Sequence, residues 1–153
     1  MPEDHPITNY NQITANIYLG TNLCCMLHSQ ILDNEKFDCE IDLEGEKDDL
    51  HPRTNIYLRL PTPDMLSPSV SQLQAGVALL AEMVRQNKKV YVHCRYGHGR
   101  SPELVAAYFM SLGLSMEAAI AKVKEKRPEI HLDDQQILGL KSYSDSLTSD
   151  ILF

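Results

Sequence analysis

The sequence has no apolar run long enough to cross a lipid bilayer. Its first residues, Met1 to Pro6, lack the basic and then apolar character of a secretory signal peptide. The 153 residues include 14 lysines and arginines against 21 aspartates and glutamates, so the basic surplus typical of nucleic-acid-binding domains is missing. We therefore expect a soluble, cytoplasmic protein with no transmembrane segment and no nucleic-acid partner.

Residues that bind metals or form disulfide frameworks are also few. The four cysteines have neither metal-ligand spacing nor the density of a disulfide scaffold. They are Cys24, Cys25, Cys39 and Cys94. The six histidines are scattered and are not accompanied by suitable ligands. We therefore expect no metal site and no other cofactor.

The chain contains no low-complexity tract or internal repeat, and 43% of its residues are hydrophobic, which suits one compact domain. We place this domain at residues 13–146, after a polar lead-in at 1–12 and before a C-terminal tail at 147–153. Apolar periodicity predicts strands over 13–20, 37–44, 55–60 and 90–93. Helices are predicted over 21–33 and 70–86, from Arg100 to Gly113, from Ser115 to Pro128 and from Asp133 onward.

Strands come early in this order, helices come late, and one central strand leads directly into a helix. The pattern predicts an α/β fold in which helices flank a central, mostly parallel sheet. A charged segment at 45–49, which includes Glu46, Asp48 and Asp49, is predicted to be a solvated loop.

The stretch 90–102, VYVHCRYGHGRSP, carries the chemistry. A buried strand stops at Cys94, and a loop with two glycines then leads to Arg100 and the start of a helix. Such a loop can turn its N–H groups toward a tetrahedral oxyanion, and the helix N-terminus favours both a phosphate dianion and a thiolate. Arg100 can offer a planar fork to two phosphate oxygens. We therefore predict that Cys94 is a nucleophile and that Arg100 is a clamp on the same phosphorus atom.

The pattern His93-Cys94-x-x-Gly97-x-x-Arg100-Ser101 resembles the phosphate-binding loop of the cysteine-dependent protein tyrosine phosphatases, most closely the small dual-specificity type. The resemblance implies a three-layer domain of that type and a metal-independent reaction through a phosphocysteine intermediate. It also implies that Ser101 hydrogen-bonds the Cys94 sulfur and that His93 orders the loop from a buried position. The loop residues implied to bind the substrate phosphate are Arg95, Tyr96, Gly97, His98, Gly99 and Arg100.

Asp64 lies in a loop with three prolines, 30 positions before Cys94. A leaving oxygen departs far more easily when it is protonated, and the resemblance makes Asp64 the general acid that supplies the proton and later activates water. The other interpretation is that Asp64 only stabilises a turn beside Pro63. Asp42, Asp48 and Asp49 are the rival carboxylates.

These residues predict a protein tyrosine or dual-specificity phosphatase that acts on a phosphorylated protein or peptide. A basic residue directly after the cysteine, here Arg95, also occurs in relatives that act on phosphoinositides or phosphatidylglycerophosphate, so a phosphorylated lipid headgroup, or another phosphate such as an RNA 5′-phosphate, stays an alternative. Those lipid-directed loops usually carry further lysine or arginine where this chain has His98. A non-catalytic phosphate-binding pseudophosphatase and a sulfur-transfer domain are the alternatives from other classes.

The adjacent Cys24 and Cys25 leave two interpretations open. They are ordinary buried side chains, or one of them protects an oxidised Cys94 by forming a disulfide, as the resemblance to this superfamily implies.

Overall fold

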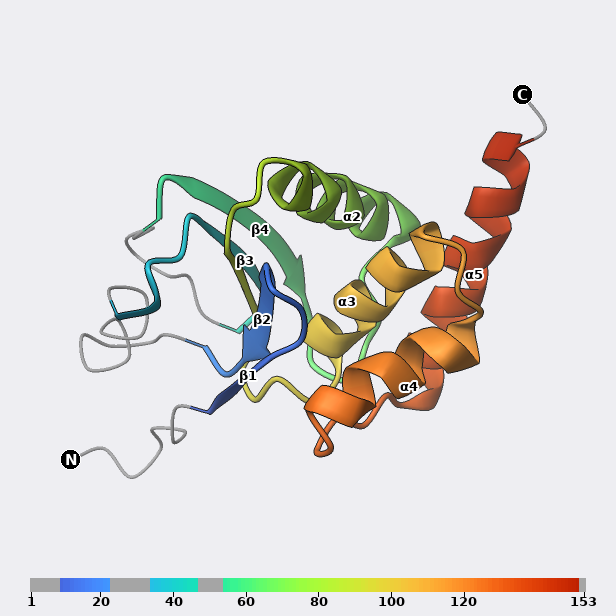
Figure 1. Ribbon diagram of the computed structural model, residues 1–153. Coiled ribbons are helices and arrows are strands. Elements are labelled where there is room, and N and C mark those ends of the chain that lie inside the picture. Colours follow the sequence, from blue (N-terminus) through green and yellow to red (C-terminus); the bar gives the residue numbers. More distant parts are fainter. Residues whose placement is uncertain (1–8, 23–33, 47–53, 152–153) are drawn as a thin grey trace.

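The computed structural model describes residues 9–22, 34–46 and 54–151 (Figure 1). Within these ranges, five strands form one sheet in the order β1-β2-β5-β3-β4. The strands are β1 Tyr10–Gln12, β2 Ile17–Gly20, β3 Cys39–Glu44, β4 Ile56–Thr62 and β5 Val90–His93. β1 pairs antiparallel with β2, and the other neighbouring strands are parallel. The predicted α/β fold with a central, mostly parallel sheet is confirmed.

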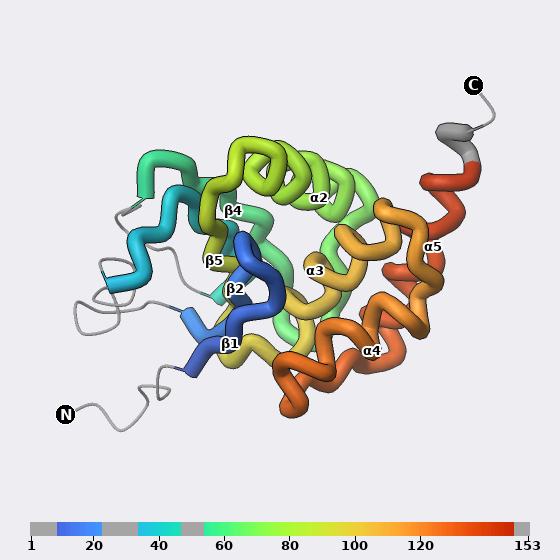
Figure 2. Tube along the Cα trace, in the orientation of Figure 1, coloured from blue at the N-terminus to red at the C-terminus, as the bar shows by residue number. Residues whose placement is uncertain are grey.

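The four helices that the described residues form lie on one side of this sheet (Figures 1 and 2). They are α2 Val70–Arg85, α3 Arg100–Ser111, α4 Met116–Lys126 and α5 Asp134–Ile151. The central helix α3 packs on three strands and on the other three helices. Its residues from Arg100 to Met110 are all buried, which agrees with the apolar pattern of this segment.

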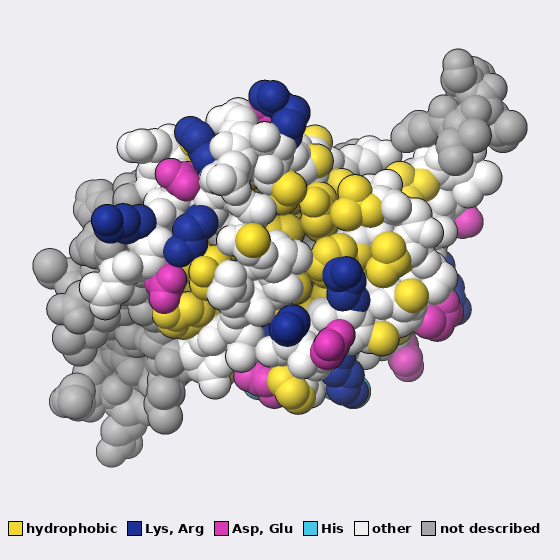
Figure 3. All heavy atoms as spheres, in the orientation of Figure 1, with side chains coloured by type: hydrophobic (Ala, Val, Ile, Leu, Met, Phe, Trp, Pro, Cys, Tyr) yellow, Lys and Arg dark blue, Asp and Glu magenta, His cyan; other side chains and the backbone are white. Residues whose placement is uncertain are grey.

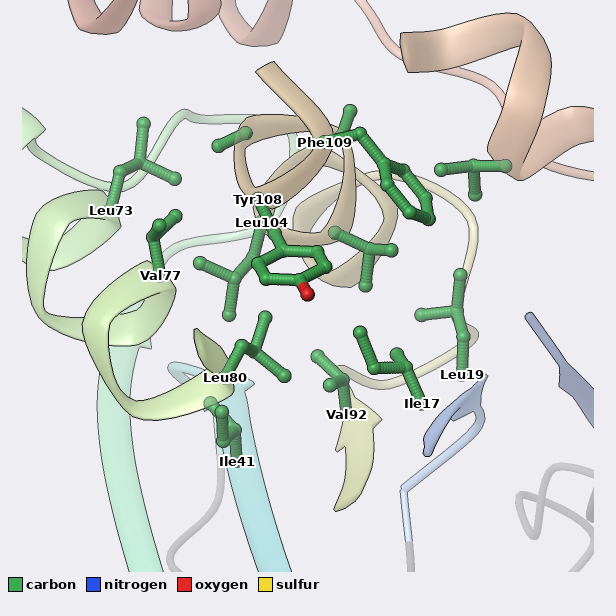
Figure 4. Close-up of a cluster of buried hydrophobic side chains, with 14 of the residues drawn as sticks. Ile17, Leu19, Ile41, Leu73, Val77, Leu80, Val92, Leu104, Tyr108 and Phe109 are labelled. Carbon is green, nitrogen blue, oxygen red and sulfur yellow. The ribbon is translucent and has the colours of Figure 1, made fainter. Parts of the chain in front are cut away.

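The core forms where the apolar face of the sheet meets α2 and α3 (Figure 4). Ile17, Ile41 and Val92 of three neighbouring strands point toward Leu80 of α2 and Leu104 of α3 (Figure 4). All five side chains are 0% exposed. Burial of each such side chain contributes about 1.5–3 kcal/mol to folding, so these contacts fix α3 firmly on β5.

β3 is buried on both faces, although every second residue of it is acidic. Cys39, Ile41 and Leu43 belong to the core. The side chains of the alternate face, Glu40, Asp42 and Glu44, are only 1–2% exposed. Alternation in the sequence therefore predicted the strand correctly, but here it does not separate a buried face from a solvated one.

The start of α2 is fixed by a capping box. Ser69 Oγ accepts a hydrogen bond from the Gln72 backbone N–H at 3.1 Å, and Gln72 Oε1 accepts one from the Ser69 N–H at 2.9 Å. The amide of Gln72 also donates to the carbonyl oxygen of Pro61 at 3.1 Å. This contact ties the start of the helix to the end of β4, directly before the loop that carries Asp64.

Two boundaries differ from the sequence-based expectation. β1 lies within 1–12, the range interpreted as a lead-in, because a short polar segment becomes an edge strand only through its partner β2. α5 continues through residues that we assigned to the tail, as far as Ile151. Most of the helix predicted over 21–33, with Cys24 and Cys25, lies outside the described residues.

The surface shown in Figure 3 has hydrophobic side chains gathered over the helices, with basic and acidic side chains around them. Across the described part of the chain, no helix is both long and apolar enough to cross a membrane. The cytoplasmic location stays a prediction.

Candidate active site

The segment between β5 and α3, which we call the phosphate loop (residues 94–100), begins at Cys94. The Cys94 side chain is buried, and its Sγ lies 3.1 Å from the hydroxyl oxygen of Ser101 in the first turn of α3. Cys94 lines a cavity of about 260 Å³. Asp64 and Arg100 line the same cavity. The structure thus brings together the predicted nucleophile, clamp and acid, although Asp64 comes from a different strand-to-helix loop.

Arg100 is fixed from the side of β3 and β4. Its Nη1 donates to Glu46 Oε1 at 2.6 Å and to the carbonyl oxygen of Thr62 at 2.8 Å, and its Nη2 donates to the other Glu46 oxygen at 3.3 Å. Burial alone lowers the pKa of the Arg100 guanidinium, but the hydrogen bond to Glu46 and the electrostatic effect of Cys94 raise it overall. The clamp is therefore a fully charged and rigidly held group.

Asp64 lies at the open side of the cavity. Its carboxylate is 62% exposed, and Oδ1 lies 3.5 Å from Arg100 Nη2. The same oxygen accepts a hydrogen bond from the Met65 N–H at 2.9 Å, while Met65 itself has a left-handed backbone with φ of 67°. Asp64 therefore makes the turn contact of the simpler interpretation and also faces the cavity.

His93 is 0% exposed and lies behind the loop, out of the cavity. Its Nε2 lies 2.6 Å from Glu40 Oε1, and its Nδ1 lies 3.6 Å from Asp42 Oδ1. Burial raises the pKa of Asp42, and the nearby His93 opposes that rise. Asp42, one of the rival acids, is thus engaged behind the loop, and Asp48 and Asp49 lie outside the described residues.

The mouth of the cavity is aromatic. The rings of Tyr96 and His98 stack with centroids 6.2 Å apart, and both residues line the cavity. Arg95 packs on the Tyr96 ring, 5.4 Å from its centroid, and donates from Nε to the Tyr96 hydroxyl at 3.1 Å. Partial burial, together with Arg127, lowers the pKa of His98.

The two glycines of the loop are required by close approaches. Gly97 has φ of 70°, and a Cβ at this position would lie 2.6 Å from the carbonyl oxygen of Gly20. A Cβ at Gly99 would lie 2.7 Å from the side-chain amide of Gln136. The contact at Gly97 is with backbone, so only glycine lets the loop pack against β2, whereas the contact at Gly99 is with the end of a side chain of α5.

Comparison with known proteins agrees with this geometry. A family model described as "Dual specificity phosphatase, catalytic domain" matches residues 17–146. The chain belongs to this family. A mouse relative, phosphatidylglycerophosphatase and protein-tyrosine phosphatase 1, is 34% identical over 139 residues, which are 90% of this chain and 69% of the relative. The human protein of the same name is 35% identical over 94 residues, but that match spans only 47% of its length.

Solved structures show the same fold. The crystal structure of PTPMT1 superposes with a TM-score of 0.77 at 27% identity, covering 94% of this chain and 99% of that one. Tk-PTP in its active form has a TM-score of 0.75 at 29% identity, covering 89% and 96%. The predicted resemblance to the small dual-specificity phosphatases is confirmed.

Two residues of this dual-specificity phosphatase domain were missed by the sequence analysis. Glu46 was assigned to a solvated loop, yet it contacts the clamp Arg100. Arg127 lies at the end of the helix predicted from Ser115 to Pro128 and was not named as a site residue, yet it is buried and donates to the carbonyl oxygens of Tyr96 and Gly97. The adjacency of parallel strands could have indicated Glu46, because the carboxyl ends of β3 and β5 lie at one edge of the sheet.

Proposed function

We propose that this chain hydrolyses phosphate monoesters through a phosphocysteine intermediate on Cys94 and that its substrates are phosphorylated proteins or peptides. The observation that supports this most strongly is the shared cavity of Cys94, Arg100 and Asp64, with the hydroxyl of Ser101 beside the sulfur. The pseudophosphatase alternative would not need an acid at the cavity mouth.

In the first step, loop N–H groups and Arg100 hold the phosphate oxygens, and the Cys94 thiolate attacks phosphorus. The bond from phosphorus to the ester oxygen breaks, and Asp64 gives its proton to that oxygen. In the second step, Asp64 takes a proton from water, the resulting hydroxide attacks phosphorus, and the phosphorus–sulfur bond breaks. The departing thiolate accepts a hydrogen bond from Ser101, and the products are inorganic phosphate and an alcohol or phenol.

The charges around the cavity favour a protein substrate. Arg100 is the one lysine or arginine among the residues that line this cavity, and the proposed mechanism uses it for the scissile phosphate. A headgroup with a second phosphate would find the carboxylates of Asp64 and Asp133 in the same lining. The stacked rings of Tyr96 and His98 instead offer flat surfaces to a phenyl group or a peptide.

A lipid phosphomonoester is the second candidate. The mouse relative, whose name includes phosphatidylglycerophosphatase, matches 90% of this chain. In addition, Met65, Leu66 and Tyr96 are exposed by 65%, 46% and 45%, and Met65 and Tyr96 line the cavity, where they could contact acyl chains.

The test is phosphate release, with chelator present, from a phosphotyrosine peptide and from vesicles containing phosphatidylglycerophosphate. Wild type is compared with Cys94→Ser and Asp64→Asn, and Arg85→Ala on the exposed side of α2 is the control. We expect faster turnover of the peptide, its loss in Cys94→Ser and a fall of about 100-fold in Asp64→Asn. Faster turnover of the lipid would favour the second candidate. Turnover that survives in Cys94→Ser would overturn the mechanism.

A further inference from the structure

The loop that carries Asp64 (residues 63–68, the Asp64 loop) is attached to the helices at its far end. Ser67 Oγ lies 2.8 Å from Glu103 Oε2 and 2.9 Å from the carbonyl oxygen of Pro68. Glu103 lies on α3, three residues after the clamp Arg100, and is 0% exposed. The contact therefore joins the loop of the proposed acid to the helix that carries the phosphate clamp.

The protons of this contact can be assigned. Ser67 has one hydroxyl proton but two oxygen neighbours that accept hydrogen bonds. Burial raises the pKa of Glu103 to about 9, since the opposing effect of Ser67 is smaller, so Glu103 holds a proton at neutral pH. Glu103 then donates to Ser67 Oγ, and Ser67 donates to the carbonyl oxygen of Pro68.

The remaining oxygen of Glu103 supports this assignment. Oε1 is buried and has no hydrogen-bond partner among the described residues. A buried carboxylate anion without a partner for this oxygen would cost far more than a neutral carboxyl group. The Ser67–Glu103 contact is thus a hydrogen bond between two neutral groups.

Residues of α5 also contact the Asp64 loop and limit its position from a second side. Gln136 Nε2 donates to the carbonyl oxygen of Leu66 at 3.4 Å. A Cβ at Gly139 would lie 1.8 Å from Ser67 Oγ, so the serine side chain occupies the space that this glycine leaves open. The Asp64 loop therefore fits α3 and α5 in one position.

We propose that the Ser67–Glu103 hydrogen bond holds the Asp64 loop in the position from which Asp64 reaches the leaving oxygen, so that Ser67 and Glu103 are positioning residues for proton transfer. The inference rests on the proposed function, in which Asp64 is the general acid. A carboxylic acid that never touches the substrate thereby affects the step in which the ester bond breaks.

The test compares two aryl phosphates whose phenols differ in acidity. Loss of proton transfer slows the release of phenol, a poor leaving group, much more than the release of dinitrophenol, a good one. For Ser67→Ala we expect about a 10-fold fall in kcat/KM for phenyl phosphate and less than about a 2-fold fall for dinitrophenyl phosphate, because kcat/KM reports only the steps up to release of the phenol. Ser146→Ala, which removes a hydroxyl bonded within α5, is the matched control.

Two further variants separate positioning from general loss of structure. In Glu103→Gln, the amide still donates to Ser67 Oγ, so we expect the wild-type ratio between the two substrates. In Gly139→Ala, the added methyl displaces Ser67, so we expect the same ratio between the two substrates as in Ser67→Ala. This variant tests the inference even if Ser67→Ala folds poorly. Thermal unfolding of each variant reports its folded state.

Equal losses for both substrates in Ser67→Ala and Gly139→Ala, or wild-type rates in both, would overturn the inference. Asp64→Asn is measured beside them. If Asp64→Asn shows the selective loss and Ser67→Ala does not, the positioning role alone fails. If Asp64→Asn shows no selective loss, the acid assignment in the proposed function fails, and the inference fails with it.

Discussion

Arg127 and Gly97 are joined by a hydrogen bond of 2.8 Å from the guanidinium Nε to the carbonyl oxygen. The same side chain donates to the carbonyl oxygen of Tyr96 at 3.0 Å and to the side chains of Asn9 and Asn11 at 2.8 and 2.7 Å. In a trans peptide the N–H points opposite to the carbonyl. The N–H groups of Gly97 and His98 are therefore directed away from Arg127, as phosphate binding requires.

Replacing Arg127 by lysine tests this relationship. A lysine ammonium cannot reach carbonyls and amides on several sides at once, so buried acceptors would lose their donors. For Arg127→Lys we expect a KM for aryl phosphate raised about 10-fold and a free energy of unfolding lowered by about 2 kcal/mol. Steady-state kinetics and urea unfolding measure both, with the exposed Arg85→Lys as control. An unchanged KM would show that Arg127 does not orient the loop.

Two glycines with positive φ distinguish the effect of backbone strain from the effect of a steric clash. Gly97 has φ of 70° and the carbonyl of Gly20 in contact range, whereas Gly113 has φ of 106° and nothing within 4 Å of an added Cβ. For Gly113→Ala we expect a loss of about 1 kcal/mol in unfolding free energy and unchanged kinetics. For Gly97→Ala we expect a larger loss and at least about a 10-fold weaker affinity for vanadate, measured by inhibition. Equal effects of the two changes would contradict the close approach of Gly97 to β2.

Ser101 should affect the second chemical step more than the first. Its hydroxyl lies 3.1 Å from Cys94 Sγ, where it can stabilise the thiolate that leaves phosphorus. In Ser101→Ala we expect kcat to fall about 10-fold or more, with a burst of phenol before steady turnover, because the phosphocysteine accumulates. Ser101→Thr keeps the hydroxyl and should restore single-phase kinetics. Rapid-mixing measurements that show no burst in Ser101→Ala would contradict this role.

Glu103 gives the stability of the fold a pH dependence of known sign. Burial raises its pKa from 4.5 to about 9 in the folded protein. Between these values the folded state holds a proton that the unfolded state has lost, so the contribution of Glu103 is complete below about pH 4.5 and is lost as pH rises toward 9. Glu103→Gln cannot titrate, and its stability relative to wild type should therefore increase from pH 5 to pH 8 by ~1 kcal/mol or more. Urea unfolding at both values measures this, and parallel changes in the two proteins would show that Glu103 is ionised when folded.

Features that depend on residues close together in the chain could be predicted without the structure. The distance from Cys94 to Arg100, the two glycines between them and the following helix start are local properties, and they predicted a phosphate loop. Apolar periodicity likewise predicted the strand β5 and the helices α2 and α3. The roles of the site residues stay predictions until the variants are measured, and the proposed disulfide of Cys24 or Cys25 falls outside the described residues.

The groups that surround that loop come from distant parts of the chain, and the fold was needed to identify them. Glu46 meets Arg100 across 54 positions of sequence, Arg127 reaches Gly97 across 30, and Glu103 meets Ser67 across 36. These contacts follow from the strand order, which sets β3 beside β5, and from the packing of α2 and α4 on α3. A charged residue is expected to be solvated, because burying it costs free energy unless it has a hydrogen-bonding partner. Whether such a partner lies nearby depends on the fold.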